Sequence, residues 1–241
     1  MTEDAEALQY PSKINVVDAS YADMTKVWLL ALQKSIPLRM EGDQLSSYAS
    51  SLGKLFDCPR RCYWDRVDAI PDHSTKYFAD ASLGDMCHEW AVDVYKRAGL
   101  WRASEVRGSH QGCNLSYRID VLIEEPFSGE IVPVEIKSQH RDKYEETVAR
   151  GRPLEDHELQ LQCYMHFNRP LPFEWGLMHY ICRNRAESTL FRVMYNPKVG
   201  EAIQSSLLQL ESDIAHHVLP PKGGQDCWFC TYKKRCKETK A

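Results

Sequence analysis

The clearest pattern of hydrophobic and polar positions lies between residues 117 and 138. Apolar and polar residues alternate on both sides of a short segment, 124–130, that contains Pro126, Ser128 and Gly129. Alternation with a period of two places successive side chains on opposite faces of a β-strand, and proline, serine and glycine favour turns. The pattern therefore predicts two antiparallel strands that form a hairpin.

Three charged residues of this hairpin are expected to lie close together. Glu135 and Lys137 share one face of their strand, and Asp120 can lie opposite them across the ladder. Two carboxylates and an ammonium beside a buried apolar face are costly unless they bind a cation or a phosphate. The three residues are therefore candidates for a functional site, although a hairpin with ordinary charges on its solvated face would show the same pattern.

Other segments have a helical or a strand-like pattern. Apolar residues at helical spacing predict helices within 20–35, 43–67, 82–99, 154–168 and 197–218. In the second of these, Leu45, Leu52, Leu55 and Phe56 are spaced to face inward. A strand is expected within 101–118, a second hairpin from 174–184 and 188–196, and a polar, mobile element over 143–153. We expect an N-terminal extension, 1–45, that is partly helical, followed by one domain, 46–241.

The composition narrows the class of protein. Of the 241 residues, 43% are hydrophobic and 27% are charged, which is ordinary for a soluble globular protein. The apolar runs are too short to span a bilayer, and the acidic N-terminus has no apolar signal core. We therefore expect a cytoplasmic protein that does not contact membranes. If the protein is viral, we expect it in the cytoplasm of the host cell. The net charge of −4 implies that any nucleic acid would need a local basic strip.

The nine cysteines do not fit a secreted disulfide framework, because their number is odd and their spacing is uneven. Cys227, Cys230 and Cys236 have the spacing Cys-x2-Cys-x5-Cys, which suits three thiolate ligands of a soft metal or a cluster. The fourth ligand must come from elsewhere; Cys58 is the first candidate and Cys62 the alternative. A thioredoxin-type redox pair is disfavoured because the strand and long helix of that fold do not surround Cys227 and Cys230. We expect the remaining cysteines to be small buried apolar residues: Cys87, Cys113, Cys163 and Cys182.

Four motifs along the chain resemble, in type and order, those of the RecB-like branch of the PD-(D/E)XK nucleases. They are Gly84-x3-His88-Glu89, Asp120 followed by Glu135-Ile136-Lys137, Gln160-x3-Tyr164, and the divided cysteine set. The step Cys58-Pro59-Arg60 with the C-terminal cysteines is similar to the iron–sulfur clamp of the Cas-four family of CRISPR-associated exonucleases and of AddB-type nucleases. The pairing of this clamp with the charged hairpin is more specific than either motif alone.

The resemblance implies a restriction-endonuclease-like α/β fold, with a mixed central sheet flanked by helices and a clamp that joins the N- and C-terminal parts. It implies that His88, Asp120, Glu135 and the carbonyl of Ile136 hold Mg2+ or Mn2+. It also implies that Lys137 positions the attacking water, with Gln160 and Tyr164 in support. Cys58, Cys227, Cys230 and Cys236 would bind a [4Fe-4S] cluster, with Zn2+ as the alternative because tetrathiolate sites suit both metals.

The implied function is that of a metal-dependent deoxyribonuclease, an exonuclease on single-stranded DNA ends with endonuclease activity as a further option. A basic strip for the phosphate backbone is expected beside the cysteines, although solvated charges would give the same pattern: Arg60, Arg61, Lys233, Lys234 and Arg235. The alternative is a non-catalytic DNA-binding or scaffold module of nuclease ancestry in a CRISPR adaptation or recombination complex. No Walker loop occurs, because Tyr48 stands where the first glycine before Gly53-Lys54 is required.

Overall fold

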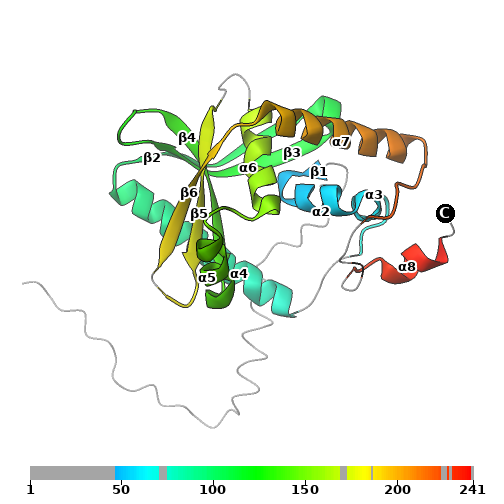
Figure 1. Cartoon of the computed structure of the whole chain (residues 1–241), viewed down its shortest axis with the longest axis horizontal. Helices are drawn as coiled ribbons and strands as arrows, with labels where there is room; N and C mark the ends of the chain where they lie inside the picture. The colour runs from blue at the N-terminus through cyan, green and yellow to red at the C-terminus, as the bar shows by residue number, and fades with distance from the viewer. Residues whose placement is uncertain are drawn as a thin grey trace, which may run out of the picture. The chain divides into compact units, whose positions relative to one another are not determined.

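A mixed β-sheet runs through the protein, and helices cover both of its faces (Figure 1). The structure is a computed structural model that describes residues 47–70, 75–168, 173–185, 187–223, 227 and 230–239. The structure does not describe the expected N-terminal extension, 1–45. The helix expected over 20–35 and the inward-facing position expected for Leu45 therefore lie outside the described residues. The α/β fold with a mixed central sheet flanked by helices is confirmed.

The sheet has the order β1-β3-β4-β5-β6, and β2 pairs with the other edge of β3. The strands are β1 (Ser47–Tyr48), β2 (Trp101–His110), β3 (Leu115–Glu124), β4 (Ile131–Gln139), β5 (Trp175–Cys182) and β6 (Ser188–Met194). The pairs β2–β3, β3–β4 and β5–β6 are antiparallel, and the pairs β1–β3 and β4–β5 are parallel. Both predicted hairpins, β3–β4 and β5–β6, and the predicted strand before them are confirmed.

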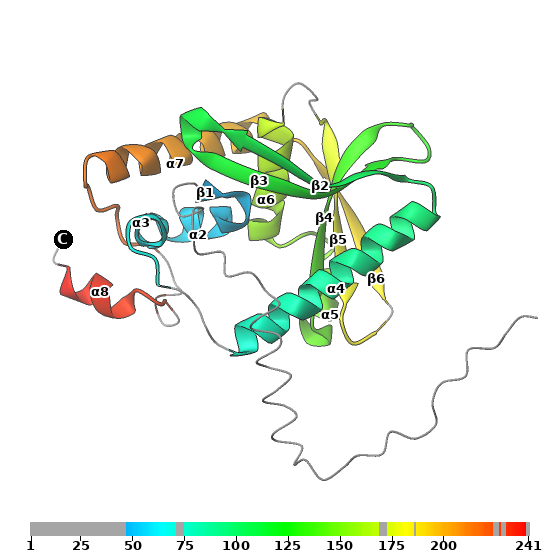
Figure 2. The same cartoon turned by 180° about the vertical axis from the view of Figure 1, so that it is seen from behind.

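Two apolar layers hold the helices against the sheet. The helices are α2 (Leu52–Asp57), α3 (Pro59–Val67), α4 (Thr75–Arg97), α5 (Arg141–Arg150), α6 (Glu155–Phe167), α7 (Pro197–Ala215) and α8 (Lys233–Glu238), with 3-10 turns η1 (Ala49–Ser51) and η2 (Gln111–Cys113). Ala91 and Tyr95 of α4 pack on Val134 and Ile136 of β4. A second cluster joins β3 and β5 to α2, α3, α6 and α7. Figure 2 shows α4 crossing the sheet, with α6 and α7 behind it.

The predicted helices at 82–99, 154–168 and 197–218 are confirmed as α4, α6 and α7, with different ends. Within the described residues, no helix is both long enough and apolar enough to cross a membrane. The segment 143–153, expected to be a polar, mobile element, lies largely in α5, which buries Tyr144 and Thr147 and is capped by Gly151 with a φ of 68°. Glycine tolerates this left-handed conformation at the end of a helix.

The single helix expected over 43–67 is wrong. Ser47 and Tyr48 form a strand parallel to β3, and residues 49–67 are divided between η1, α2 and α3. Residues 43–46 lie outside the described residues. Cys58 separates α2 from α3 with φ −148° and ψ 92°, because a residue that precedes a proline is disfavoured in the helical region. Leu52 and Leu55 are buried as expected, but Phe56 is exposed.

The C-terminal helix α8 is fastened to the segment that follows α3. The hydroxyl of Tyr232 donates to Asp65 Oδ1 at 2.8 Å and accepts the amide of Ile70 at 3.1 Å. Arg235 forms an ion pair with Asp68 at 2.5 Å. These contacts bring the C-terminal cysteines to the same side of the protein as Cys58.

Candidate functional site

Asp120 and Glu135 face each other where β4 separates from β3. The antiparallel register ends at the pair Val121 and Val134, and the two carboxylates stand at the next position along. Asp120 is 5% exposed and Glu135 is 1% exposed. Asp120 Oδ2 accepts the backbone amide of Ile136 at 2.7 Å, so this carboxylate satisfies a donor of β4 beyond the last ladder pair.

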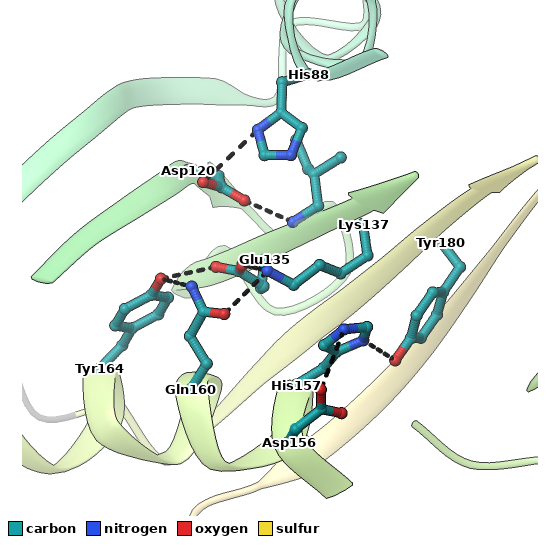
Figure 3. Close-up of polar contacts among 10 residues, drawn as sticks. His88, Asp120, Glu135, Lys137, Asp156, His157, Gln160, Tyr164 and Tyr180 are labelled. Carbon is teal, nitrogen blue, oxygen red and sulfur yellow. Dashed lines mark hydrogen bonds and ion pairs between the residues drawn. The ribbon is translucent and has the colours of Figure 1, made fainter. Parts of the chain in front are cut away.

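Lys137 and two residues of α6 surround the Glu135 carboxylate (Figure 3). Lys137 Nζ donates to Glu135 Oε1 at 2.5 Å, and the hydroxyl of Tyr164 donates to Glu135 Oε2 at 2.8 Å. Gln160 joins the two partners, because its Oε1 accepts from Lys137 at 2.9 Å and its Nε2 donates to the Tyr164 hydroxyl at 2.6 Å. The predicted residues Glu135, Lys137, Gln160 and Tyr164 therefore form one closed network.

The spacing of Gln160 and Tyr164 lets helix α6 place both of them over the sheet. Gln160 and Tyr164 are four residues apart and therefore lie on one face of the helix. Leu161 and Met165, the residues that follow each of them, are buried in the core below. The packing of the apolar side of α6 thus fixes the distance of the Gln160 amide and the Tyr164 hydroxyl from β4.

His88 reaches the site from α4, on the other side of Asp120. Its Nδ1 lies 3.7 Å from Asp120 Oδ1, which is too long for a hydrogen bond but close enough for a shared ligand. Burial lowers the pKa of His88, against the opposing effect of the Glu135 charge. The imidazole is therefore neutral near pH 7 and has a lone pair for a metal ion.

The site has too little positive charge for its two carboxylates. Burial and the neighbouring Glu135 charge raise the pKa of Asp120 well above its ordinary value, although the Ile136 amide and Lys137 oppose this shift. Burial alone would lower the pKa of Lys137, but the charge and hydrogen bond of Glu135 raise it overall. Among the residues described, Lys137 is the cation that bonds to one of these acids, while Arg118, whose charge also acts on Asp120, pairs with Glu105. A divalent cation would supply the missing charge.

The donors available to such an ion are two carboxylates, the imidazole of His88 and the carbonyl of Ile136. Oxygen ligands with one imidazole suit Mg2+ or Mn2+. Across the part of the chain that the structure describes, no three His, Cys, Asp or Glu side chains stand close enough to hold an ion as they are. Both Glu135 oxygens are engaged by Lys137 and Tyr164, so an ion would have to share one of them.

Two further histidines lie near this network and were not predicted. His157, on the same face of α6 as Gln160, has Nδ1 2.9 Å from the hydroxyl of Tyr180. Burial and the charge of Lys137 lower the pKa of His157 to about 4. His179 of β5 has Nδ1 3.0 Å from the hydroxyl of Tyr95, and burial with the nearby His88 lowers its pKa to about 4. The helical spacing of 157, 160 and 164 was the signal that could have found His157.

A second candidate site is a pocket between α3 and the C-terminal segment. All four cysteines predicted as cluster ligands line it, together with basic and aromatic residues: Cys58, Arg60, Arg61, Trp64, Lys222, Cys227, Cys230, Tyr232, Lys233, Cys236 and Lys237. The alternative ligand Cys62 is not among them, because its thiol is buried and points to the carbonyl of Ser51 at 3.9 Å. Burial and the charge of Asp65 raise the pKa of Cys62 to about 12, so it is a poor source of thiolate.

The expected basic strip needs a correction at Arg60. This residue is 7% exposed and donates from Nε to the carbonyl of Pro220 at 2.8 Å, so it is not available to a phosphate backbone. Arg235 pairs with Asp68 and lies over the ring of Trp64. Arg61 and Lys233 line the cysteine pocket, and Lys234 is exposed.

Three of the four cysteines expected to be small buried residues are buried: Cys113, Cys163 and Cys182. Cys87 departs from the expectation, because it is only partly buried at the edge of the α4 cluster.

Comparisons with known proteins identify the fold. No protein-family model matches the chain, and no curated protein sequence matches it. A crystal structure of SSO0001 is similar with 20% identity and a TM-score of 0.56, over 90% of this chain and 98% of that chain. LHK-Exo in complex with dAMP is similar with 14% identity and a TM-score of 0.58, over 81% of this chain and 96% of that chain. A structure of LHK-Exo, an alkaline exonuclease from Laribacter hongkongensis, is similar with 12% identity and a TM-score of 0.56, over 89% of this chain and 100% of that chain. The chain thus shares the fold of an exonuclease.

Proposed function

We propose that the protein is a divalent-metal-dependent deoxyribonuclease that hydrolyses phosphodiester bonds. The observation that carries the proposal is a pair of buried acids, Asp120 and Glu135, at opposing positions of β3 and β4, with Lys137 bonded to Glu135. Such a pair can hold a divalent ion, which would activate a water molecule for hydrolysis of a phosphodiester. Gln160 and Tyr164 of α6 complete the arrangement through their bonds to Lys137 and Glu135.

The residues that would hold the ion are Asp120, Glu135, His88 and the carbonyl of Ile136. A bound ion would acidify a water molecule and offset the charge that develops on the phosphate. Lys137, held between Glu135 and Gln160, would position the attacking water and stabilise that charge. Tyr164 would fix the orientation of the Glu135 carboxylate through its hydrogen bond to Oε2.

The substrate we propose is DNA with free ends, and single-stranded ends in particular. Support comes from the shared fold with LHK-Exo, which is described as an exonuclease and has been crystallised with dAMP, a deoxynucleoside monophosphate. A nucleotide of this kind is the product that stepwise hydrolysis of a DNA strand would release.

The test is a cleavage assay on single-stranded and double-stranded DNA labelled at either end, with Mg2+ or Mn2+ and with a chelator. We expect cleavage that needs the ion and that is lost in Asp120→Ala and in Lys137→Ala. Glu124→Gln is the matched control, because Glu124 is an exposed acid of the same strand that pairs with Arg102. Cleavage that survives both site variants would refute the proposal, and DNA binding without cleavage would favour a scaffold module.

We also propose that Cys58, Cys227, Cys230 and Cys236 hold a [4Fe-4S] cluster. All four line one pocket, and four thiolates gathered in this way suit a [4Fe-4S] cluster. Trp64 also lines the pocket, and its buried indole N–H has no acceptor among the described residues. Inorganic sulfide would provide one. Anaerobic purification with iron, sulfide and zinc analysis tests the proposal, and stoichiometric zinc without iron would overturn it.

A further inference from the structure

Arg60 is a buried cation that bonds to a backbone carbonyl and lies beside a cysteine sulfur. It lies in the first turn of α3, two residues after Cys58, and is 7% exposed. Its Nε donates to the carbonyl of Pro220 at 2.8 Å, and its Nη1 lies 3.8 Å from Cys236 Sγ. Among the residues that the structure describes, no carboxylate forms an ion pair with it.

A guanidinium remains charged under all conditions in which proteins fold. Its transfer from water to the interior is costly unless an anion is near, and a carbonyl oxygen replaces only part of the lost hydration. Among the residues described, the sulfur of Cys236 is the other polar contact of the Arg60 side chain. The burial of this residue is therefore explained if the sulfur, or what it binds, carries negative charge.

The charged residues around the pocket also indicate that its contents carry negative charge. Arg60 lines it together with four further cations, Arg61, Lys222, Lys233 and Lys237, while the described part of its wall includes no acidic residue. Lys222 and Lys237 are exposed, and Arg61 and Lys233 are half-buried, so water screens their charges to a large extent. Arg60 alone is buried, and its field acts on the cysteines with little screening.

We propose that Arg60 compensates the negative charge of the cysteine pocket and thereby sets the reduction potential of the cluster held there. The inference rests on the proposed cluster. A [4Fe-4S] centre with four thiolate ligands gains one negative charge when it is reduced. A fixed cation at Cys236 stabilises the reduced form more than the oxidised form and raises the potential.

The test compares Arg60→Gln, Arg60→Lys and the control Arg61→Gln by spectroelectrochemical titration of the anaerobic full-length protein. Glutamine can still donate a hydrogen bond but has no charge, whereas lysine keeps the charge. At a fixed ambient potential we expect the reduced-to-oxidised ratio of the Arg60→Gln cluster to fall about tenfold, which is about 59 mV for one electron. Arg60→Lys should remain near the wild-type potential, and Arg61→Gln should shift far less than Arg60→Gln.

The outcomes separate the two proposals. Wild-type protein without iron refutes the cluster itself, whatever the variants do. A cluster in Arg60→Gln with the wild-type potential, or with the same shift as Arg61→Gln, overturns the role of Arg60. If Arg60→Gln retains no iron, Arg60→Lys decides: iron retained at a wild-type potential supports charge compensation, and iron lost there too shows that Arg60 serves packing alone.

Discussion

The hydroxyl of Tyr164 on α6 donates to Glu135 Oε2 on β4 at 2.8 Å, across 29 residues of sequence. This bond fixes one oxygen of a buried carboxylate whose other oxygen accepts from Lys137. Gln160 donates to the same hydroxyl, so the hydroxyl proton is directed toward Glu135 and not elsewhere. Gln160 and Tyr164 of α6 therefore orient the Glu135 carboxylate of β4.

Removal of this hydroxyl should slow cleavage without unfolding the protein. In Tyr164→Phe the ring stays in the core, but Glu135 Oε2 loses its donor and the carboxylate is free to rotate. Partners of this type typically contribute about 10- to 100-fold to activity or metal affinity, and we expect a loss of that size. Single-turnover rates at saturating metal, together with the metal concentration needed for half-maximal rate, measure it.

Tyr144→Phe is the matched control for this prediction. Tyr144 is also buried, and its hydroxyl lies 2.8 Å from Thr189 Oγ1, so the variant loses one comparable hydrogen bond outside the network. We expect its cleavage rate to match that of the wild type. Equal rates in Tyr164→Phe and Tyr144→Phe would show that Tyr164 does not orient the acid.

Asp120→Asn should stabilise the metal-free protein and abolish its stabilisation by metal. The folded state raises the pKa of Asp120 above its value in the unfolded chain, so the free energy of unfolding decreases as the pH rises from the unfolded-state pKa to the folded-state pKa. Above the folded-state pKa the ionised carboxylate destabilises the fold by the full amount. Asparagine removes this charge and still accepts the Ile136 amide. Thermal unfolding with chelator should therefore show a higher midpoint for the variant than for the wild type.

The same thermal unfolding experiment with Mn2+ in place of chelator should give the opposite order of midpoints, with the wild type above Asp120→Asn. An ion that binds only the folded state adds about 2.7 kcal/mol at one hundred times its dissociation constant. We expect this gain for the wild type and not for Asp120→Asn. An equal rise in both midpoints would place the ion elsewhere on the protein.

The sequence predicted the parts of the site that depend on local pattern. Alternation sets which residues of β3 and β4 share a face, and the spacing of four sets which residues of α6 do, so Asp120, Glu135, Gln160 and Tyr164 could be placed before the structure. The fate of Arg60 could not, because it depends on Pro220 and Cys236, more than 150 residues away. Local pattern places Arg60 within a helical segment, and only the packing of the C-terminal segment decides that it is buried.

Two cysteines four residues apart should respond in opposite ways to substitution. Cys58 lines the cysteine pocket, whereas Cys62 is buried and contacts Ser51. Cys58→Ala should lose the iron, and Cys62→Ala should keep about four irons per chain with some loss of thermal stability from the small cavity. Iron analysis and visible absorption after anaerobic purification distinguish them. Iron lost from Cys62→Ala and kept in Cys58→Ala would show that the fourth ligand was assigned to the wrong cysteine.

His157 should affect the rate of cleavage without shaping its dependence on pH. The neutral imidazole bonds to Tyr180 beside Lys137, and its pKa of about 4 means that it does not titrate between pH 5 and 8. In His157→Asn we expect a slower rate, because the neutral imidazole that bonds to Tyr180 near the Lys137 charge is lost, with a pH–rate profile of unchanged shape. His166→Asn is the control, since His166 lies on the same helix but contacts Tyr195 and Gln204. A change of shape confined to His157→Asn would mean that His157 exchanges a proton during the reaction.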